Sequence, residues 1–373
     1  MNALPPPEFV KIDPLAIEQD LITRYEKRSG KKLYPAQIEH LFIDQVDYAL
    51  VRALSAIQQT GEQMLVSYSE APIIDYLGEL VGVTRLPAQP AVCTLRWQLD
   101  APQSQDAFIP MFTGVSNDED TVIFTTDYDV TIAAGTLYAD VTATCRDVGK
   151  VGNGFNAGQV SKPGRSLPAG VTVANISTTS GGDAEESTEQ LRERIKLAPE
   201  SFSNAGSYGA YQFHVRSVHP SIISVAVLGP DEGLPPGHVE LYPQTLEGTP
   251  SHELLALVQA KVSSERKRPL TDRVTTKAPI TIDWQLRAKL TLYTTADTET
   301  TLALAKQAAE SNAQQLRSAL GRDIVPNQII KALQVEGVYD VELVQPAKRI
   351  PLRQHEWANC TAIELTIARV SDG

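Results

Sequence analysis

The sequence predicts an α+β multidomain protein: a helical N-terminal region, a small all-β domain, and then two mixed α/β domains. The chain has 373 residues, which is more than a single hydrophobic core usually supports. Hydrophobic residues make up 42% of it and charged residues 21%, as in ordinary folded proteins. The apolar spacing changes along the chain from helical periodicity to strand alternation and then to a mixture of both. We therefore expect four domains, at residues 1–87, 88–180, 181–275 and 276–373.

The first domain is expected to be helical. Asp13 and Pro14 form a helix start, because aspartate caps free N–H groups and proline fits the first helical turn. Pro35 is expected to open a second helix in the same way. Apolar residues recur along that helix at helical spacing: Ile38, Leu41, Phe42, Ala49, Leu50, Ala53, Leu54 and Ile57. We expect this stripe to be a packing face, and a third helix to start near Pro72.

The second domain is expected to consist of strands joined by glycine turns. Its predicted strands are rich in β-branched and aromatic residues, and they lie at 94–99, 122–126 and 137–144.

The two later domains mix helical periodicity with strand alternation. Helices are predicted near 188–197, 207–218, 251–266 and 298–319, with a short helix after Pro326. Strands are predicted at 222–228, 238–242, 280–293, 338–344 and 361–368.

The charge balance argues against nucleic acid as a partner. Acidic residues number 45 and basic residues 33, which leaves a formal net charge of -12. No apolar run approaches the ~20 residues that cross a bilayer, so we expect no direct membrane insertion. The first residues carry no signal-peptide pattern, and the three cysteines are scattered and odd in number. These features predict synthesis in a reducing cytoplasm.

Two glycine-rich segments resemble nucleotide sites only superficially. The segment 181–185 departs from the GGDEF signature of cyclic-dinucleotide synthases, because Ala184 stands where that chemistry requires an acidic residue. The glycines at 149–154 lack the spacing of a dinucleotide fingerprint, and no phosphate-binding loop follows a strand. We interpret both segments as connections between secondary-structure elements.

Motifs for metal binding and catalysis are also lacking. The six histidines form no His-Glu-x-x-His or Cys-His pairing, so they predict no zinc site. The acidic run 118–120 is too short for a calcium loop and is interpreted as a hairpin tip. No nucleophile elbow occurs, and no cysteine lies in a catalytic signature. We expect no catalytic residue, no cofactor, no metal and no enzymatic activity.

The segment 181–211 is the most specific feature of the chain. A glycine pair leaves the β domain, an acidic run leads to a serine cap, and a charged helix follows. An Ala-Gly-Ser turn then opens a second helix that carries two tyrosines. This signature segment is defined by Gly181, Gly182, Glu185, Ser187, Leu191, Arg192, Arg194, Ala205, Gly206, Ser207, Tyr208 and Tyr211.

The order of these residues resembles the central signature of the phage baseplate J family, the wedge proteins at the tip of contractile tails. In that family a glycine pair and an acidic Ser/Thr run precede a Leu-Arg-x-Arg-Ile helix and a proline. A Ser/Asn-Ala-Gly-Ser/Thr turn and a tyrosine-bearing helix come next. Flanking segments on both sides resemble the same family, so the resemblance covers most of the chain.

The resemblance implies a structural baseplate wedge subunit of a contractile phage tail or a related contractile injection system. Such a subunit assembles into a ring around the central hub and rearranges on sheath contraction. The implied partners are other copies of the chain, a smaller tail protein of the wedge, a lysozyme-like wedge protein and the hub. The implied location is the tail baseplate of the virion, after synthesis in the bacterial host cytoplasm.

A cell-wall-degrading tail enzyme is the alternative function, because paired carboxylates can be dispersed along a sequence. A receptor-binding tip protein is a third option, although the repetitive β structure of that class is absent from the sequence.

The roles of individual signature residues remain open at the level of sequence. The glycine pair is the predicted bend. For Arg192 and Arg194 a solvated helix face is the simpler interpretation, and interface ion pairs are the other. Tyr208 and Tyr211 are predicted anchors, either in an interface or in the core.

Overall fold

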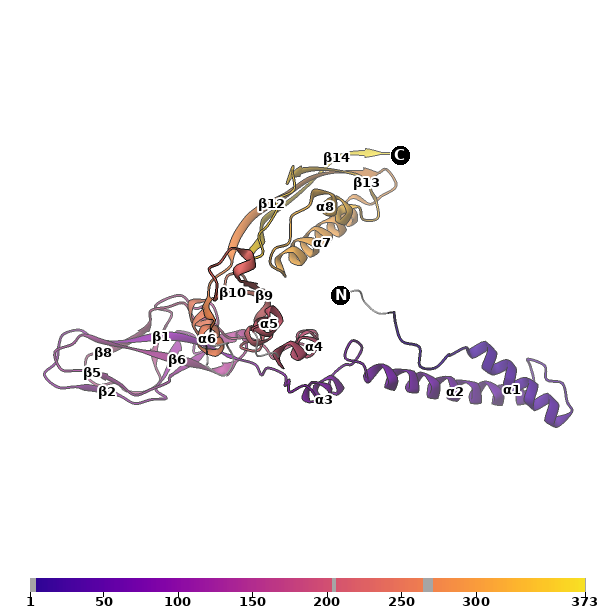
Figure 1. Ribbon diagram of the computed structural model, residues 1–373, viewed down its shortest axis with the longest axis horizontal. Helices are drawn as coiled ribbons and strands as arrows, with labels where there is room; N and C mark the ends of the chain where they lie inside the picture. Colours follow the sequence, from indigo (N-terminus) through magenta and orange to yellow (C-terminus); the bar gives the residue numbers. More distant parts are fainter. Residues whose placement is uncertain (1–4, 203–205, 264–270, 373) are drawn as a thin grey trace. The chain divides into compact units, whose positions relative to one another are not determined.

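The computed structural model describes residues 5–202, 206–263 and 271–372, and it confirms the α+β multidomain class. The chain divides into two compact units, each described below by itself (Figure 1). One unit contains Met1–Thr84 together with Leu191–Lys196, and the other contains Arg85–Gln190 and Leu197–Gly373. The finer division into four domains stays a prediction. None of the described helices is both long and apolar enough to span a bilayer.

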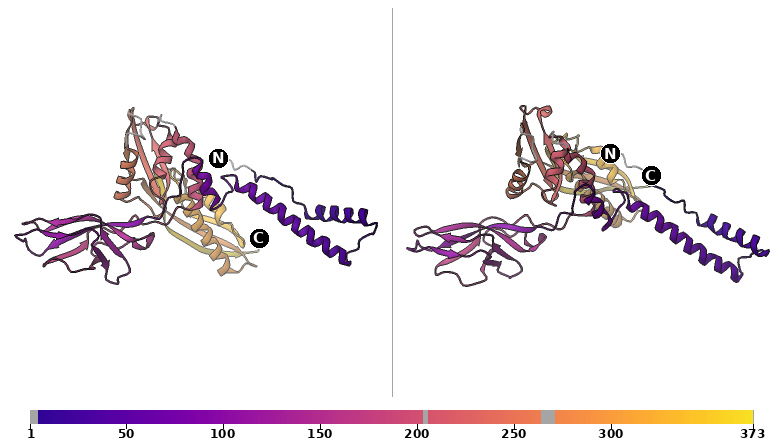
Figure 2. Two further views of the ribbon diagram at one scale, coloured as in Figure 1. Left: turned by 90° about the horizontal axis from the view of Figure 1, so that it is seen from below. Right: turned by 60° about the horizontal axis from the view of Figure 1, so that its bottom comes forward.

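The helical unit is built on a hairpin of two helices, α1 (Pro14–Ser29) and α2 (Ile38–Gln63), which lie side by side (Figures 1 and 2). Helix α1 begins as predicted, because Asp13 accepts a hydrogen bond from the backbone N–H of Ala16 at 3.1 Å. The prediction that Pro35 opens α2 is wrong. Pro35 lies in a turn that closes when Gln37 N donates to Tyr34 O at 3.1 Å.

A short third helix, α3 (Ile73–Glu79), follows α2, close to the predicted start at Pro72. Within the helical unit, most of the predicted packing face of α2 is exposed, and Leu54 is partly buried. Ile38 is 70% exposed and Phe42 is 69% exposed, and Ile43 is the buried residue of the helix.

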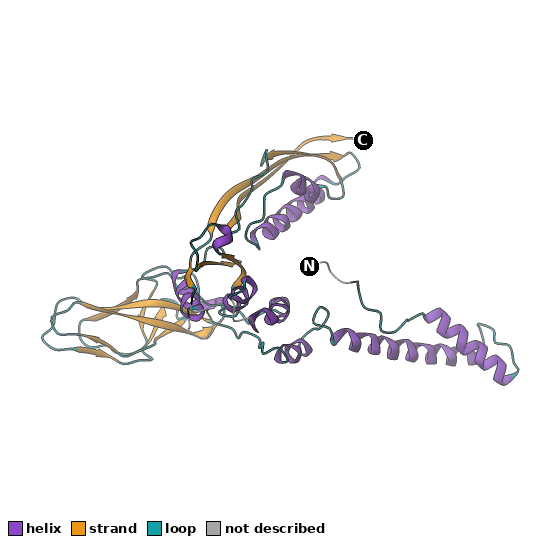
Figure 3. Cartoon of the chain, in the orientation of Figure 1, coloured by secondary structure: helices purple, strands orange, loops and turns teal. Residues whose placement is uncertain are grey.

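The β domain contains strands and a single short 3-10 turn among its described residues (Figure 3). Its main sheet has the order β7-β3-β4-β6-β1-β8 with antiparallel neighbours, and its two outermost strands come close, so the sheet curls almost into a barrel. The core packs around Trp97 and Phe124, which are fully buried. The strands are β1 (Pro90–Leu99), β2 (Ala107–Ile109), β3 (Gly114–Asn117), β4 (Ile123–Thr126), β5 (Val130–Ile132), β6 (Tyr138–Val148), β7 (Val160–Pro163) and β8 (Val171–Asn175).

The next layer is mixed, as predicted. Strand β10 is the centre of a three-stranded sheet, with β9 antiparallel on one side and β11 parallel on the other. Strand β11 was not predicted, and the end of the predicted helix 251–266 lies outside the described residues. The elements are α4 (Thr188–Leu197), α5 (Tyr208–Arg216), β9 (Ile222–Leu228), β10 (His238–Thr245), α6 (His252–Val262) and β11 (Arg273–Thr276).

The last layer repeats this sheet arrangement in a different chain order. Strand β12 is central, with β13 antiparallel and β14 parallel to it. Its helices contribute small buried residues such as Ala305 and Ala309 to the core. The elements are β12 (Ile280–Tyr293), α7 (Thr298–Arg317), α8 (Pro326–Leu333), β13 (Val338–Gln345) and β14 (Glu356–Ser371).

Candidate functional site

The signature segment starts with a glycine pair that the β domain holds in place. Gly181 has φ +87°, a left-handed conformation that favours glycine. Gly182 N donates to Asn153 Oδ1 at 2.9 Å, and Asn153 Nδ2 donates back to Gly182 O at 2.7 Å. A Cβ on Gly182 would overlap the carbonyl oxygen of Gly149. Position 182 therefore requires glycine, while the predicted bend at the pair stays a prediction.

A buried histidine, which the sequence did not single out, packs behind this pair. His219 is 6% exposed, and its Nδ1 accepts a hydrogen bond from the backbone N–H of Ser221 at 3.1 Å. That bond leaves the proton on Nε2, which donates to Gly181 O at 3.1 Å. Burial lowers the pKa of His219, so the imidazole is neutral near pH 7.

One lysine joins two acidic groups beside the same segment. Lys150 Nζ lies 2.6 Å from Glu247 Oε1 and 3.6 Å from Asp183 Oδ1. The hydrogen bond to Glu247 is the main reason why the pKa of Lys150 is raised. These groups line a pocket of about 520 Å³ together with the glycine pair and His219. Asp183 and Glu247 of this pocket are thus paired with a cation.

The acidic run divides into an exposed and a buried glutamate. Glu185 is exposed to solvent. Glu186 is buried, and its Oε2 accepts from Leu86 N at 3.0 Å while its backbone oxygen accepts from Arg85 Nη1 at 2.7 Å. Glu186 lies in the acidic run of the signature segment, but an acidic run does not indicate which of its residues is buried.

Ser187 caps helix α4, as predicted. Its Oγ accepts from Gln190 N at 3.3 Å, and Gln190 Oε1 accepts from Ser187 N at 3.1 Å, which completes a capping box. Gln190 Nε2 also donates to Pro220 O at 2.9 Å, which ties the start of the helix to the segment before β9.

The two signature arginines are buried, so the prediction of a solvated helix face is wrong for them. Arg192 is 5% exposed and Arg194 is 3% exposed, whereas Glu193 between them is exposed. Leu191 is fully buried on the same helix. The pattern of alternating charge did not predict this, because the groups that bind the arginines lie more than a hundred residues away in sequence.

Both arginines bind backbone carbonyls of the helical unit. Arg192 Nε donates to Val66 O at 2.9 Å and its Nη2 donates to Ser69 O at 2.6 Å, with Glu70 Oε1 at 3.2 Å. Arg194 Nη2 donates to Thr84 O at 2.6 Å. Guanidinium groups suit this task because several donors diverge from one plane. Helix α4 therefore binds the chain through hydrogen bonds to residues before α3 and to Thr84 after it.

The end of the signature segment is anchored in the mixed layer. Ser207 caps α5 by accepting from Ala210 N at 3.2 Å. Tyr211 is buried, and its hydroxyl donates to Asp272 Oδ2 at 2.7 Å. Tyr208 is 43% exposed and donates to Glu232 Oε2 at 2.8 Å.

The remaining signature positions flank that anchor. Gly206 has φ +72° and, with both tyrosines, lines a pocket of about 180 Å³. Ala205 lies outside the described residues.

Acidification is expected to weaken the structure around His219. The unfolded chain binds a proton near pH 6.5, and the folded imidazole does so only at lower pH. The stabilisation that comes from keeping His219 neutral in the folded chain is complete above about pH 6.5. It is lost as the pH falls toward the folded-state pKa of His219, because the unfolded state then binds more protons than the folded state. Denaturant unfolding of the wild type and His219→Gln between about pH 7 and pH 5 should give free energies that converge as the pH falls.

His252 is exposed at the first position of α6, so His252→Gln is the matched control and should run parallel to the wild type. Wild-type and His219→Gln curves with the same pH slope would show that His219 does not carry this linkage.

Models of protein families match the β domain and the two mixed layers described above. Three family models match consecutive segments of the chain: the Baseplate J-like protein barrel domain at residues 94–182, the Baseplate J-like central domain at 203–278, and the Baseplate J-like protein C-terminal domain at 284–366.

One relative and one solved structure are similar to the chain over different lengths. Baseplate protein J of Escherichia phage P2 is 35% identical over 176 residues, which is 47% of this chain and 57% of that protein, so the match spans little more than half of the relative. A chain in the cryo-EM structure of the anti-feeding prophage baseplate, 6-fold symmetrised, is 14% identical with a TM-score of 0.42, over 94% of this chain and 90% of that one.

The family models extend over most of the chain from β1 to β14, and the signature segment that prompted the resemblance connects the first matched segment to the second. The chain belongs to the baseplate J-like family.

Proposed function

We propose that this chain is a structural wedge subunit of the baseplate of a contractile phage tail or a related contractile injection system. It assembles into a ring around the central hub and rearranges on sheath contraction. Its partners are other copies of itself, a smaller tail protein of the wedge, a lysozyme-like wedge protein and the hub. It is made in the host cytoplasm and resides in the tail baseplate of the virion. The family name denotes a structural protein, and we propose no reaction for the chain.

The observation that carries this proposal is the outer face of α2. Small and apolar side chains recur there at intervals of three and four residues, which places them on one side of the helix. None of them is buried in this chain. We call them the outer stripe of α2: Ile38, Phe42, Val46, Ala49, Ala53 and Ile57.

The opposite face of α2 mixes polar and apolar side chains. His40, Asp44, Asp47 and Gln58 are partly buried on the side that meets α1, where a helix of a globular protein usually carries its apolar residues. Ile43, Val51 and Leu54 lie on that same side of the helix, so α2 carries apolar residues on both faces. Contiguous exposed apolar surface of this kind is typical of a site that another protein covers.

The outer stripe contains no charged residue, so a charged partner surface would lose its hydration without gaining an ion pair. An apolar helix from a second copy of this chain, or from the smaller wedge protein, fits it by ridges-into-grooves packing along α2. The stripe extends from Ile38 to Ile57, which gives such a partner several helical turns of contact.

A charge placed on the outer stripe is expected to block assembly and leave the chain folded. Phe42→Glu changes an exposed side chain, so the free energy of unfolding of the free chain should change by no more than about 0.5 kcal/mol. Covering that glutamate with an apolar partner would desolvate its charge. Tails made with this variant in place of the wild type should lack baseplates in negative-stain images.

Ser55→Glu is the matched control, because Ser55 is exposed on α2 but lies outside the outer stripe. Tails with Ser55→Glu should be intact. Intact, contractile tails with Phe42→Glu would contradict the assignment of the outer stripe to assembly, and tails that form normally with the whole gene deleted would contradict the baseplate role itself.

A further inference from the structure

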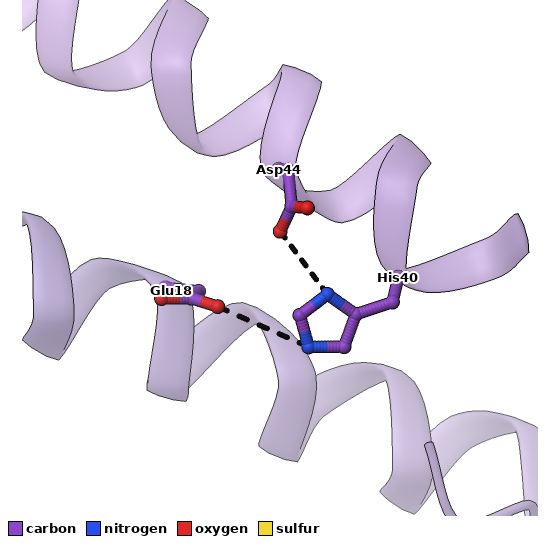
Figure 4. Close-up of side chains that lie close together, drawn as sticks. All are labelled: Glu18, His40 and Asp44. Atoms are coloured by element: carbon purple, nitrogen blue, oxygen red, sulfur yellow. Dashed lines mark ion pairs between the residues drawn. The ribbon is translucent and has the colours of Figure 1, made fainter. Parts of the chain in front are cut away.

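One histidine and two carboxylates come together between α1 and α2 (Figure 4). His40 and Asp44 are one turn apart on α2, and Glu18 reaches them from α1. Asp44 Oδ1 lies 3.2 Å from His40 Nδ1, and Glu18 Oε1 lies 3.9 Å from His40 Nε2. Taking one ligand atom from each residue, the three atoms lie within 4.8 Å of one another. In the part of the chain that the structure describes, this is the one group of three such residues.

The apolar interior of the hairpin is small. Helix α1 has no buried residue, and α2 has Ile43 alone. Polar contacts also join α2 to the segment before α1: Gln58 Oε1 accepts from the backbone N–H of Phe9 at 2.8 Å, and Gln58 Nε2 donates to Pro7 O at 2.7 Å. Small folded units with little apolar core often depend on a metal or another cross-link.

We propose that Glu18, His40 and Asp44 bind one Zn²⁺ ion that cross-links α1 to α2. An imidazole nitrogen with two carboxylate oxygens is a donor set that zinc accepts, with water in the fourth position. Magnesium and calcium prefer sites made of oxygen alone, so the imidazole selects against them. The side chain of His40 is 16% exposed, which limits competition by water, while Glu18 and Asp44 remain accessible enough for an ion to enter.

The positions of the three groups fit this ion with one small movement. Two ligand atoms of a tetrahedral zinc site lie roughly 3.3 Å apart, given zinc bonds of about 2.0 Å. The 3.2 Å between His40 Nδ1 and Asp44 Oδ1 already matches that spacing. The carboxylate of Glu18 must turn toward the same ring nitrogen, and a glutamate with three side-chain torsions, 33% exposed, can do so.

The experiment uses the full-length, untagged chain after dialysis against a chelator. Isothermal titration with Zn²⁺ should give one ion per chain, and Co²⁺ in its place should give visible d–d bands. Hydrogen exchange should slow in α1 and α2 when Zn²⁺ is added and recover with chelator. His40→Ala and Glu18→Gln should each weaken zinc binding at least about tenfold. Glu18→Gln nearly preserves side-chain size, and far-UV circular dichroism checks that both variants keep their helices.

His252→Ala is the matched control, since His252 is an exposed histidine that lies outside this cluster. The His252→Ala variant should bind Zn²⁺ like the wild type. An imidazolium between two carboxylates would make the same contacts without any metal. Absence of zinc uptake, or equal uptake by wild type and His40→Ala, would therefore overturn the proposal and identify the three residues as an ion-pair cluster.

Discussion

Replacing Arg192 with alanine is expected to lower the free energy of unfolding of the helical unit by about 3 kcal/mol. The guanidinium satisfies two backbone carbonyls, those of Val66 and Ser69, and it faces the carboxylate of Glu70. Alanine removes the donor from both carbonyls and leaves the space of the guanidinium unfilled. Each buried carbonyl left without a hydrogen bond lowers the free energy of unfolding by about 1–3 kcal/mol. Denaturant unfolding followed by circular dichroism measures the loss, and hydrogen exchange should show it in residues 66–84.

Glu193→Ala provides the matched control, because Glu193 is the exposed neighbour of Arg192 on the same helix. It should change the free energy of unfolding by no more than about 0.5 kcal/mol. Arg192→Lys should recover only part of the loss, since an ammonium cannot reproduce the planar geometry of the guanidinium. Equal unfolding midpoints for Arg192→Ala and Glu193→Ala would show that the arginine does not hold this unit together.

Gly182→Ala is expected to destabilise the junction after the β domain by about 3 kcal/mol. The added Cβ would overlap Gly149 O and lie 2.9 Å from Asn153 Oδ1 and 3.1 Å from Ala91 N. Two of these three neighbours are backbone atoms, so relief requires the chain to move, which in well-packed regions costs roughly 1–3 kcal/mol and occasionally more. The movement would also break the paired hydrogen bonds between Gly182 and Asn153.

The measurement is denaturant unfolding followed by tryptophan fluorescence, because Trp97 lies in the core of the β domain. Gly164→Ala is the control: it has ordinary backbone geometry, and a Cβ there would meet Gly114 O at 3.4 Å, an ordinary van der Waals contact. It should cost less than about 1 kcal/mol. If both alanine variants unfold at the same midpoint, the close approach at Gly182 does not constrain the fold.

Two of the later strands were predicted closely, whereas β2, β3, β5, β7 and β8 of the β domain were not predicted. The predicted spans 222–228 and 280–293 agree with β9 and β12. Both combine β-branched residues with a turn signal at the end, and a strand buried by its own neighbours needs little more than this local pattern. Strand β11 was missed because its four residues, Arg273–Thr276, are too short and too polar to show alternation.

The signature segment was found from the sequence, but its contacts were not. Arg192 and Arg194 look like a solvated face because charge on a helix is usually exposed. Their acceptors are backbone carbonyls, which every residue carries, so no residue type upstream reveals the partner. His219 was overlooked for a related reason: its main acceptor is Gly181 O.

The sequence relates only two of the three residues in the cluster of Glu18, His40 and Asp44. His40 and Asp44 are four residues apart on a predicted helix, a spacing that places both on one face. Glu18 could not be joined to them without knowing how α1 lies against α2. The predicted stripe combined residues from different sides of α2, because Ile38, Phe42 and Ile57 are exposed whereas Leu54 is partly buried. Periodicity alone cannot tell whether a face turns toward its own chain or away from it.

The outward direction of that stripe affects the chain before any assembly takes place. In the proposed assembly, a newly made copy carries an open apolar face until its partner covers it, and contact with a wrong protein competes with contact with the right one. Every increase in the concentration of unassembled chain therefore raises the rate of unproductive association. Under the proposed function, the supply of the partner that covers α2 therefore limits how much of the chain stays available for assembly.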